Sequence, residues 1–326
     1  MNFIERLQNW GRIVRRAFFK TLVELARDDP RIFLIVGDLG FGQIEPFMKE
    51  FPDRFINAGI AEQNMTGLAA GLAHCGKIVF TYSIGNFSTL RCLEQIRNDV
   101  CYHNASVCVA SVGGGYAYGA LGMSHHATED LAIMRALPNM TVVAPGDLWE
   151  TEMAVRSIVT RPGPYYIRLN LAPESPIQSL DDGFGLGKAR KIFDGHDITL
   201  ICTGSMLETT VKIARTLKQK GISSRVISMH TVEPIDVDAV LSAARETKAI
   251  FSIEEHSVRG GLGSAIAEFL LESDCRPPLF RRIGLPPEYC SNCGNQDYLL
   301  KSAGLSEENI LELVKKTIDG HEKSPV

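Results

Sequence analysis

The chain has 326 residues, of which 45% are hydrophobic and 22% are charged, and its formal net charge is −4. This length predicts two domains of ordinary size, and the composition is typical of globular proteins. The small net charge argues against a nucleic-acid or anionic-membrane partner. No apolar run approaches the length of a membrane span.

The N-terminal segment and the cysteines indicate the compartment. Residues 1–20 are charged and amphipathic and lack the apolar core of a secretory signal, so we expect them to form the first helix. The eight cysteines are scattered, mostly in apolar segments, as free thiols are in a reducing cytoplasm. Only Cys290 and Cys293 have metal or redox spacing, and without a second ligand pair nearby we interpret them as structural. We expect a cytoplasmic protein.

Short β-rich runs alternate with longer helical patterns in the first half of the chain, which predicts an α/β domain with a mainly parallel sheet. The expected strands are residues 32–36, 55–57, 78–80, 107–111, 141–144 and 165–168. The expected helices are residues 43–51, 62–75, 89–102, 128–136 and 147–159.

A second α/β series follows a segment rich in proline, glycine and serine between residues 171 and 187, which predicts a linker. The expected strands are residues 198–202, 224–228, 249–253 and 279–283, and the expected helices are 206–220, 237–245, 263–272 and 306–318. We therefore assign residues 1–175 to the first domain, 176–190 to the linker and 191–326 to the second domain.

Glu62 is the most informative single residue of the chain. It begins an amphipathic helix rich in small residues, directly after the expected strand 55–57. A carboxyl group that points from such a face into a pocket tends to hold a proton, and it can then donate a hydrogen bond to a heterocyclic nitrogen. The alternative from the residues alone is an ordinary acid that stabilises a helix start.

Four stretches, the first of which contains Glu62, follow one another along the chain at believable spacings. They are INAGIAEQNMTGLAAGLAHCGK (56–77), CLEQIRNDV (92–100), HHATEDLAIMRALPNMTVVAPGD (125–147) and GPYYIR (163–168). Together, over about residues 12–170, they resemble the pyrimidine-binding half of transketolase and its thiamine-diphosphate relatives. The residues that follow resemble the transketolase C-terminal domain. The resemblance implies two α/β domains with mainly parallel sheets, the first with the pyrimidine-domain fold. It also implies that Glu62 bonds a ring nitrogen of the cofactor's aminopyrimidine.

The resemblance assigns three further residues to thiamine. Asp38 and Leu39 follow the first expected strand, and ligands in open α/β sheets bind beyond the carboxyl ends of strands. A tight turn is the alternative there. Phe87 matches an aromatic residue that stacks on the aminopyrimidine, a contact that contributes about 1 kcal/mol beyond burial. A core phenylalanine is the alternative at that position.

The substrate side of the resemblance involves four residues. His125 matches a histidine that contacts the donor ketose, and the adjacent His126 is an alternative for the same role. An imidazole at this place can hydrogen-bond sugar hydroxyls and move protons, so His125 is also a catalytic candidate with Glu62. Arg168, at the end of an expected strand, and Arg15 match arginines that bind the sugar phosphate.

Other positions depart from the family pattern. Leu121 stands where transketolases have an acid, a second substrate histidine is replaced near Gly113, and a phosphate-side serine is replaced near Gly42. These changes put the usual pentose-phosphate substrates in doubt. The glycine-rich run 113–119 misses the dinucleotide-binding fingerprint by one residue, and we interpret it as a flexible loop that faces the substrate.

The sequence lacks the Gly-Asp-Gly motif with which the family holds the metal and the diphosphate. The resemblance then implies that a separate subunit supplies the diphosphate-binding domain and the ligands of Mg²⁺ or Ca²⁺, in a two-plus-two assembly. We expect the small subunit of a split transketolase. The alternatives are the beta subunit of a 2-oxoacid dehydrogenase, which would act with lipoamide, and a non-catalytic α/β scaffold.

Overall fold

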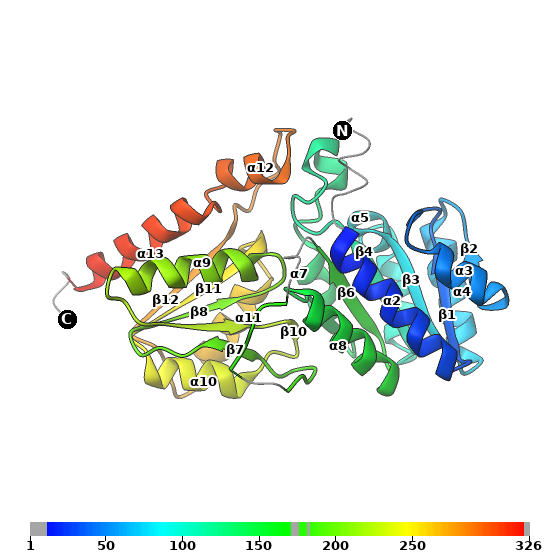
Figure 1. Cartoon of the computed structure of the whole chain (residues 1–326), viewed down its shortest axis with the longest axis horizontal. Helices are drawn as coiled ribbons and strands as arrows, with labels where there is room; N and C mark the ends of the chain where they lie inside the picture. Colours follow the sequence, from blue (N-terminus) through cyan, green and yellow to red (C-terminus); the bar gives the residue numbers. More distant parts are fainter. Residues whose placement is uncertain (1–11, 171–175, 181–182, 323–326) are drawn as a thin grey trace.

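The structure is a computed structural model that describes residues 12–170, 176–180 and 183–322. Within these residues the chain forms two α/β units that lie side by side (Figure 1). The first contains a seven-stranded sheet with the order β10-β5-β6-β4-β3-β1-β2, and the second a five-stranded sheet with the order β12-β11-β8-β9-β7. Most neighbouring strands are parallel, which confirms the predicted fold class.

The strands and helices of the first unit follow one another along the chain. The strands are β1 (Ile32–Val36), β2 (Phe55–Asn57), β3 (Ile78–Ile84), β4 (Val107–Val112), β5 (Thr141–Val143) and β6 (Tyr165–Leu169). The helices are α2 (Arg12–Asp28), α3 (Glu45–Glu50), α4 (Glu62–His74), α5 (Gly85–Ser88), α6 (Leu93–Gln95), α7 (Asp130–Arg135) and α8 (Leu148–Thr160). The other helical segments are the 3-10 helices η1 (Pro52–Arg54), η3 (Gly119–Leu121) and η4 (Met123–His125) and the π-helix η2 (Ile96–Cys101).

The second unit continues the alternation. Its strands are β7 (Arg190–Phe193), β8 (Ile198–Cys202), β9 (Ser224–Ser228), β10 (Thr231–Glu233), β11 (Ala249–Ser257) and β12 (Leu279–Leu285). Its helices are α9 (Met206–Gln219), α10 (Val237–Glu246), α11 (Leu262–Glu272), α12 (Gln296–Ser302) and α13 (Glu307–Glu322).

The first sheet buries both of its faces because alternate residues of a strand point to opposite sides. On one face, Ile35 of β1 joins a cluster that contains Met65 and Ala69 of α4. On the other face, Leu34 of β1 packs in a cluster with Phe18 and other residues of α2. Figure 1 shows α2 and α8 together across one side of this sheet. The small side chains of α4 allow the helix that begins at Glu62 to lie close to β3.

One strand crosses between the two units. β10 comes from the second half of the chain, but it pairs antiparallel with β5 and forms the edge of the first sheet. At the end of the predicted linker, Arg190 is the first residue of β7, and its buried guanidinium pairs with Asp147 and Glu150 of the first unit. The boundaries 1–175, 176–190 and 191–326 stay a prediction, and the two units they separate are joined by these contacts.

Most of the predicted elements match observed ones. The strands β7 and β10 and the helices α5 and α12 were not predicted, and the expected helix 89–102 is broken into a turn, α6 and the π-helix η2. The expected helix 1–20 lies largely outside the described residues, which enter a helix at Arg12. Among the described residues, no helix is long and apolar enough to cross a membrane.

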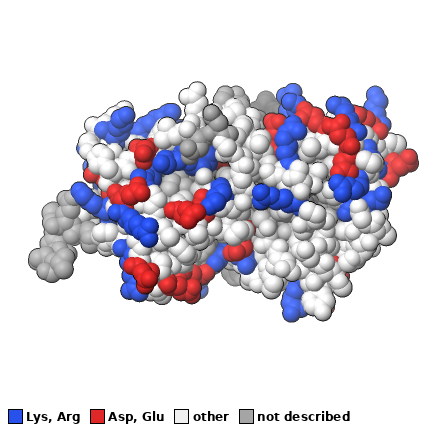
Figure 2. Space-filling model, turned by 90° about the horizontal axis from the view of Figure 1, so that it is seen from below, with Lys and Arg blue, Asp and Glu red and all other residues white. Residues whose placement is uncertain are grey.

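The charge distribution differs between the two halves of the surface. Figure 2 shows basic and acidic side chains mixed over the C-terminal half, whereas a broad part of the visible N-terminal half carries none. The exposed side of α4 agrees with this picture, because Asn64, Gly67, Leu68 and Gly71 are all exposed and uncharged. Interfaces between proteins are depleted of charged residues in the same way.

Candidate active site

Glu62 lies at the first turn of α4 and its side chain is only 2% exposed. The hydroxyl of Ser83, on β3, donates to Oε1 at 3.4 Å, and Nη1 of Arg91 donates to Oε2 at 2.9 Å. The sequence indicated an acid without a partner. The structure adds a cation, Arg91, as the partner of this buried acid.

Arg91 links Glu62 to two other predicted residues. Its guanidinium carbon lies 4.9 Å from the ring centroid of Phe87, above the ring. The Phe87 ring in turn meets the His125 imidazole edge to face, with 5.2 Å between the centroids. The structure therefore brings Glu62, Phe87 and His125 into one site, with Arg91 between the first two.

His125 and His126 differ in where their rings lie. His125 is half-buried beside Phe87, and burial, with a smaller effect of His126, lowers its pKa from the ordinary 6.5. His126 is buried against Tyr116, and its Nε2 lies 3.3 Å from the carbonyl oxygen of Gly119. Burial lowers the pKa of His126 as well, with the Gly119 contact opposing it. His125 is thus the histidine that faces the site.

The segment that carries both histidines is anchored by α5. The amide nitrogen of Asn86 donates to the carbonyl oxygen of His126 at 2.7 Å and to that of Ser124 at 3.3 Å. Because Asn86 is the neighbour of Phe87, these contacts hold the histidine-bearing segment next to the residue that carries the aromatic ring.

Asp38 and Leu39 form the turn after β1. Asp38 is exposed and has a positive φ of 54°, a conformation in which aspartate is tolerated better than most residues. Its carboxylate accepts a hydrogen bond from Asn57 at 2.9 Å, and its backbone N–H donates to Asn57 at 3.1 Å. Leu39 is half-buried against the core cluster of α2 and β1. Both residues therefore have a structural role in the turn.

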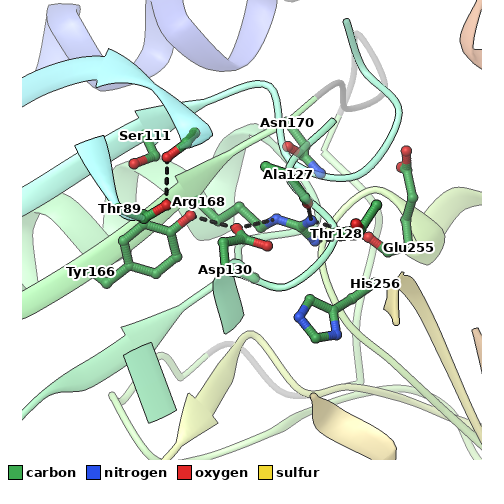
Figure 3. A network of polar contacts seen from close by, with 12 residues as sticks. Thr89, Ser111, Ala127, Thr128, Asp130, Tyr166, Arg168, Asn170, Glu255 and His256 are labelled. Atoms are coloured by element: carbon green, nitrogen blue, oxygen red, sulfur yellow. Dashed lines mark hydrogen bonds and ion pairs between the residues drawn. The ribbon is translucent and has the colours of Figure 1, made fainter. Parts of the chain in front are cut away.

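Arg168 lies at the junction of the two units, where it bonds the loop that carries the histidines. Its side chain is 2% exposed, and its Nε lies 2.9 Å from the carboxylate of Asp130 on α7. The same guanidinium donates to the carbonyl oxygens of Ala127 at 2.8 Å and of Glu255, on β11, at 3.1 Å. Figure 3 shows Arg168 between Asp130 and Glu255. All three of these partners are groups of the protein.

The glycine-rich run packs against the same junction. A Cβ atom on Gly114 would lie 1.9 Å from Nε of Arg168, and one on Gly115 would lie 2.5 Å from the Glu255 side chain. Residues 113–116 are buried, and the backbone N–H of Tyr116 donates to Glu255 at 2.7 Å. The prediction of a flexible loop is wrong for this part of the run, because the glycines are needed for close packing.

Arg15 is half-buried on α2. Burial raises the pKa of Tyr82, and the Arg15 guanidinium beside that hydroxyl partly opposes the rise.

A hollow of about 1300 Å³ lies between α2 and α8, lined by residues such as Arg16, Lys20 and Trp149. Glu62, Phe87 and His125 do not line it. Among the described residues, no cluster of three or more His, Cys, Asp or Glu side chains could hold a metal ion.

Comparison with known proteins identifies the family. Residues 12–171 match the transketolase pyrimidine-binding domain, and residues 187–310 match the transketolase C-terminal domain. The chain therefore contains the pyrimidine-binding and C-terminal domains of a thiamine-dependent enzyme family. This chain belongs to the transketolase family, and it corresponds to the smaller subunit of a split transketolase.

Three relatives show this relation in detail. The chain is 40% identical to a subunit of the apulose-4-phosphate transketolase of Phocaeicola vulgatus, over 93% of this chain and 97% of the relative. It is 38% identical to the 6-deoxy-6-sulfo-D-fructose transketolase subunit SqwH of Clostridium sp., over 91% of this chain and 92% of the relative. A solved structure described as a split gene transketolase, inactive beta4 tetramer, superimposes with a TM-score of 0.82 at 38% identity. The match covers 93% of this chain and 97% of the chain in that structure. These relatives favour a transketolase over a 2-oxoacid dehydrogenase or a scaffold.

Three residues of the site region were missed from the sequence. Arg91 pairs with an acid 29 residues away, and Glu255 contacts Tyr116 across 139 residues. Asp130 belongs to a stretch that carried the resemblance, but its partner Arg168 was assigned to a phosphate. No local pattern marks such long-range pairs, so only the fold reveals them.

Proposed function

We propose that this chain, with a partner subunit, transfers a two-carbon ketol unit from a ketose to an aldose. The observation that carries the proposal is the convergence of a buried acid, an aromatic ring and an imidazole in a chain of this family. Glu62, Phe87 and His125 form that group. The transketolase family depends on thiamine diphosphate, whose thiazolium supplies the carbon nucleophile when the cofactor is bound.

The residues present fit the pyrimidine end of thiamine diphosphate. Glu62 is buried and already bonds a planar, nitrogen-bearing group, the Arg91 guanidinium, which lies above an aromatic ring. An aminopyrimidine has the same planarity and complementary nitrogen atoms. We assign Glu62 to the ring nitrogen and Phe87 to the ring face, with Asp38 and Leu39 at the edge of the site.

The substrate side depends on His125. Its lowered pKa keeps the imidazole neutral at pH 7, so it can both donate to and accept from sugar hydroxyls. His126 is the second candidate because its buried Nδ1 has no hydrogen-bond partner among the described residues. We assign Arg168 to positioning of the loop that carries the histidines, since its donors bond the protein. Arg15 remains the proposed contact for a phosphate.

We propose that the partner subunit supplies the diphosphate-binding domain together with Mg²⁺ or Ca²⁺. This is supported by the missing Gly-Asp-Gly motif and by the relatives named as subunits of split enzymes. The uncharged exposed side of α4, with Gly67 and Gly71 open to close approach, supports an interface beside the site. We propose a two-plus-two assembly, and a cytoplasmic location remains a prediction.

The experiment is reconstitution. The chain is co-purified with its partner, supplied with Mg²⁺ and thiamine diphosphate, and offered neutral, phosphorylated and sulfonated ketoses with an aldose acceptor. We expect ketol transfer by the pair and none by the chain alone. Transfer of an acyl group from a 2-oxoacid to lipoamide would support a dehydrogenase instead. An assembly that binds no thiamine diphosphate would overturn the proposal.

A further inference from the structure

Arg91 contacts both groups that we assign to the pyrimidine ring. Its Nη1 lies 2.9 Å from Oε2 of Glu62, and its guanidinium carbon lies 4.9 Å from the centroid of the Phe87 ring. One planar group therefore hydrogen-bonds the acid and faces the aromatic ring at the same time. A pyrimidine that made both contacts would need the volume in which this guanidinium lies.

We propose that Arg91 is a positioning residue that occupies the pyrimidine's place while the site is empty, and that it must leave Glu62 when thiamine diphosphate binds. This inference rests on the proposed function. The guanidinium is a suitable placeholder because it is flat, carries N–H donors that match a carboxylate, and stacks on aromatic faces.

The positions of the two residues suit such an exchange. Glu62 is 2% exposed, and a carboxylate buried to that degree is strongly destabilising without a partner. Arg91 is 49% exposed and lies in the turn between α5 and α6, so it can move without displacing a packed element. Within the described part of the chain, its guanidinium makes no other hydrogen bond. Release of Arg91 therefore breaks one ion pair and the stacking contact with Phe87, a contact that the pyrimidine ring would replace.

The test compares cofactor affinity in the assembled enzyme. Isothermal titration calorimetry with saturating Mg²⁺ gives the Kd of thiamine diphosphate for wild type, Arg91→Met and Arg97→Met. Arg97 is an exposed control in the same segment, where it bonds the neighbouring Asn98. Methionine keeps an unbranched, flexible side chain but cannot pair with Glu62.

We expect Arg91→Met to bind thiamine diphosphate more tightly, by about 5-fold, which is the scale of a partly exposed ion pair. Arg97→Met should match wild type. A merely structural arginine would not give this result, because its loss would leave affinity unchanged or weaken it. An unchanged or weaker affinity in Arg91→Met therefore overturns the proposal. If the wild-type assembly binds no thiamine diphosphate, the proposed function fails first, and this inference fails with it.

Thermal unfolding of the isolated chain gives a second measurement that needs no cofactor. Arg91→Met should lower Tm because Glu62 is left buried without its cation. Adding Glu62→Gln to that variant should restore most of the loss, since the buried charge is then removed. If Arg91→Met leaves Tm unchanged, the ion pair does not hold the empty site, and the placeholder role is ruled out.

Discussion

Nε of Arg168 lies 2.9 Å from Oδ2 of Asp130, and the two side chains are 2% and 0% exposed. Through this pair, the interior strand β6 of the first sheet holds the first residue of α7, and the hydroxyl of Tyr166 donates to the same carboxylate oxygen. Because Arg168 also bonds the carbonyl oxygen of Glu255, the pair connects the histidine-bearing loop to the C-terminal unit.

We expect Arg168→Met to lower the free energy of unfolding by about 3 to 5 kcal/mol, because Asp130 is then buried without its cation. Urea denaturation of the isolated chain measures the loss. The double variant with Asp130→Asn should recover part of it. Normal stability in Arg168→Met, combined with a raised KM for phosphorylated sugars alone, would show that Arg168 binds phosphate instead.

We expect Phe87→Leu to weaken the binding of thiamine diphosphate to the assembled enzyme by about 5-fold, since ring stacking contributes about 1 kcal/mol beyond burial. Leucine preserves most of the apolar volume, so Tm should change little. Calorimetry with Phe193→Leu, a substitution in the second sheet, provides the control. Equal affinity for the Phe87 variant and wild type would show that this ring belongs to the core only.

His125→Asn should reduce kcat/KM for the ketose by about 100-fold while thiamine diphosphate affinity is kept. The pKa of His125 is lowered from 6.5 by burial, so the neutral form is present at pH 7 and is lost on acidification. We therefore expect wild-type kcat/KM to fall below pH 6.5 and not above it. If His126→Asn has the larger effect on KM at normal stability, the two roles are exchanged.

We expect the buried His256 to make the free energy of unfolding depend on pH. Its Nδ1 donates to the carbonyl oxygen of Ser257 at 2.7 Å, and its Nε2 accepts from the backbone N–H of Ala132 at 3.3 Å, and this second contact needs the neutral ring. Burial lowers the pKa of His256 to about 4, from 6.5 in the unfolded chain. The unfolded state therefore binds more protons between these values, and stability is lost as pH falls from 6.5 to 4.

The loss expected from His256 is about 3 kcal/mol over this range. Comparison of denaturation curves for wild type and His256→Gln isolates it, because other groups titrate in both proteins. His230, whose burial lowers its pKa to about 3, acts in the same direction, whereas Glu254, with a pKa raised to about 7, opposes both. Parallel pH profiles for the two proteins would show that His256 is not held neutral.

Much of the fold could be predicted because apolar runs mark buried strands. The run 32–36 became β1 without change of bounds, whereas β10 was missed because its three residues pair with β5 of the other unit. The expected helix 89–102 fails for a local reason. The hydroxyls of Ser88 and Thr89 bond the carbonyl oxygens of Ile84 and Gly85, and such contacts compete with helix propagation.

The site was predictable only where a motif carried it. Glu62 and Phe87 were indicated by the resemblance. One guanidinium hydrogen-bonds Glu62 and lies above the ring of Phe87. The sequence did not indicate that guanidinium, which belongs to Arg91. Arg91 lies in the turn that interrupts the expected helix 89–102. Arg168 was assigned to the sugar phosphate because it ends a strand and matches a family arginine, and its side chain is buried and bonds the carbonyl oxygen of Glu255 from the far half of the chain.

We propose that Glu62 activates thiamine diphosphate in an enzyme completed by a second subunit. The most direct measurement is turnover of ketol transfer by the reconstituted pair with Glu62→Gln, beside Glu94→Gln as an exposed control on α6. We predict at least about 100-fold lower turnover for Glu62→Gln and wild-type turnover for the control. Near-wild-type turnover of Glu62→Gln would contradict the assignment of the site.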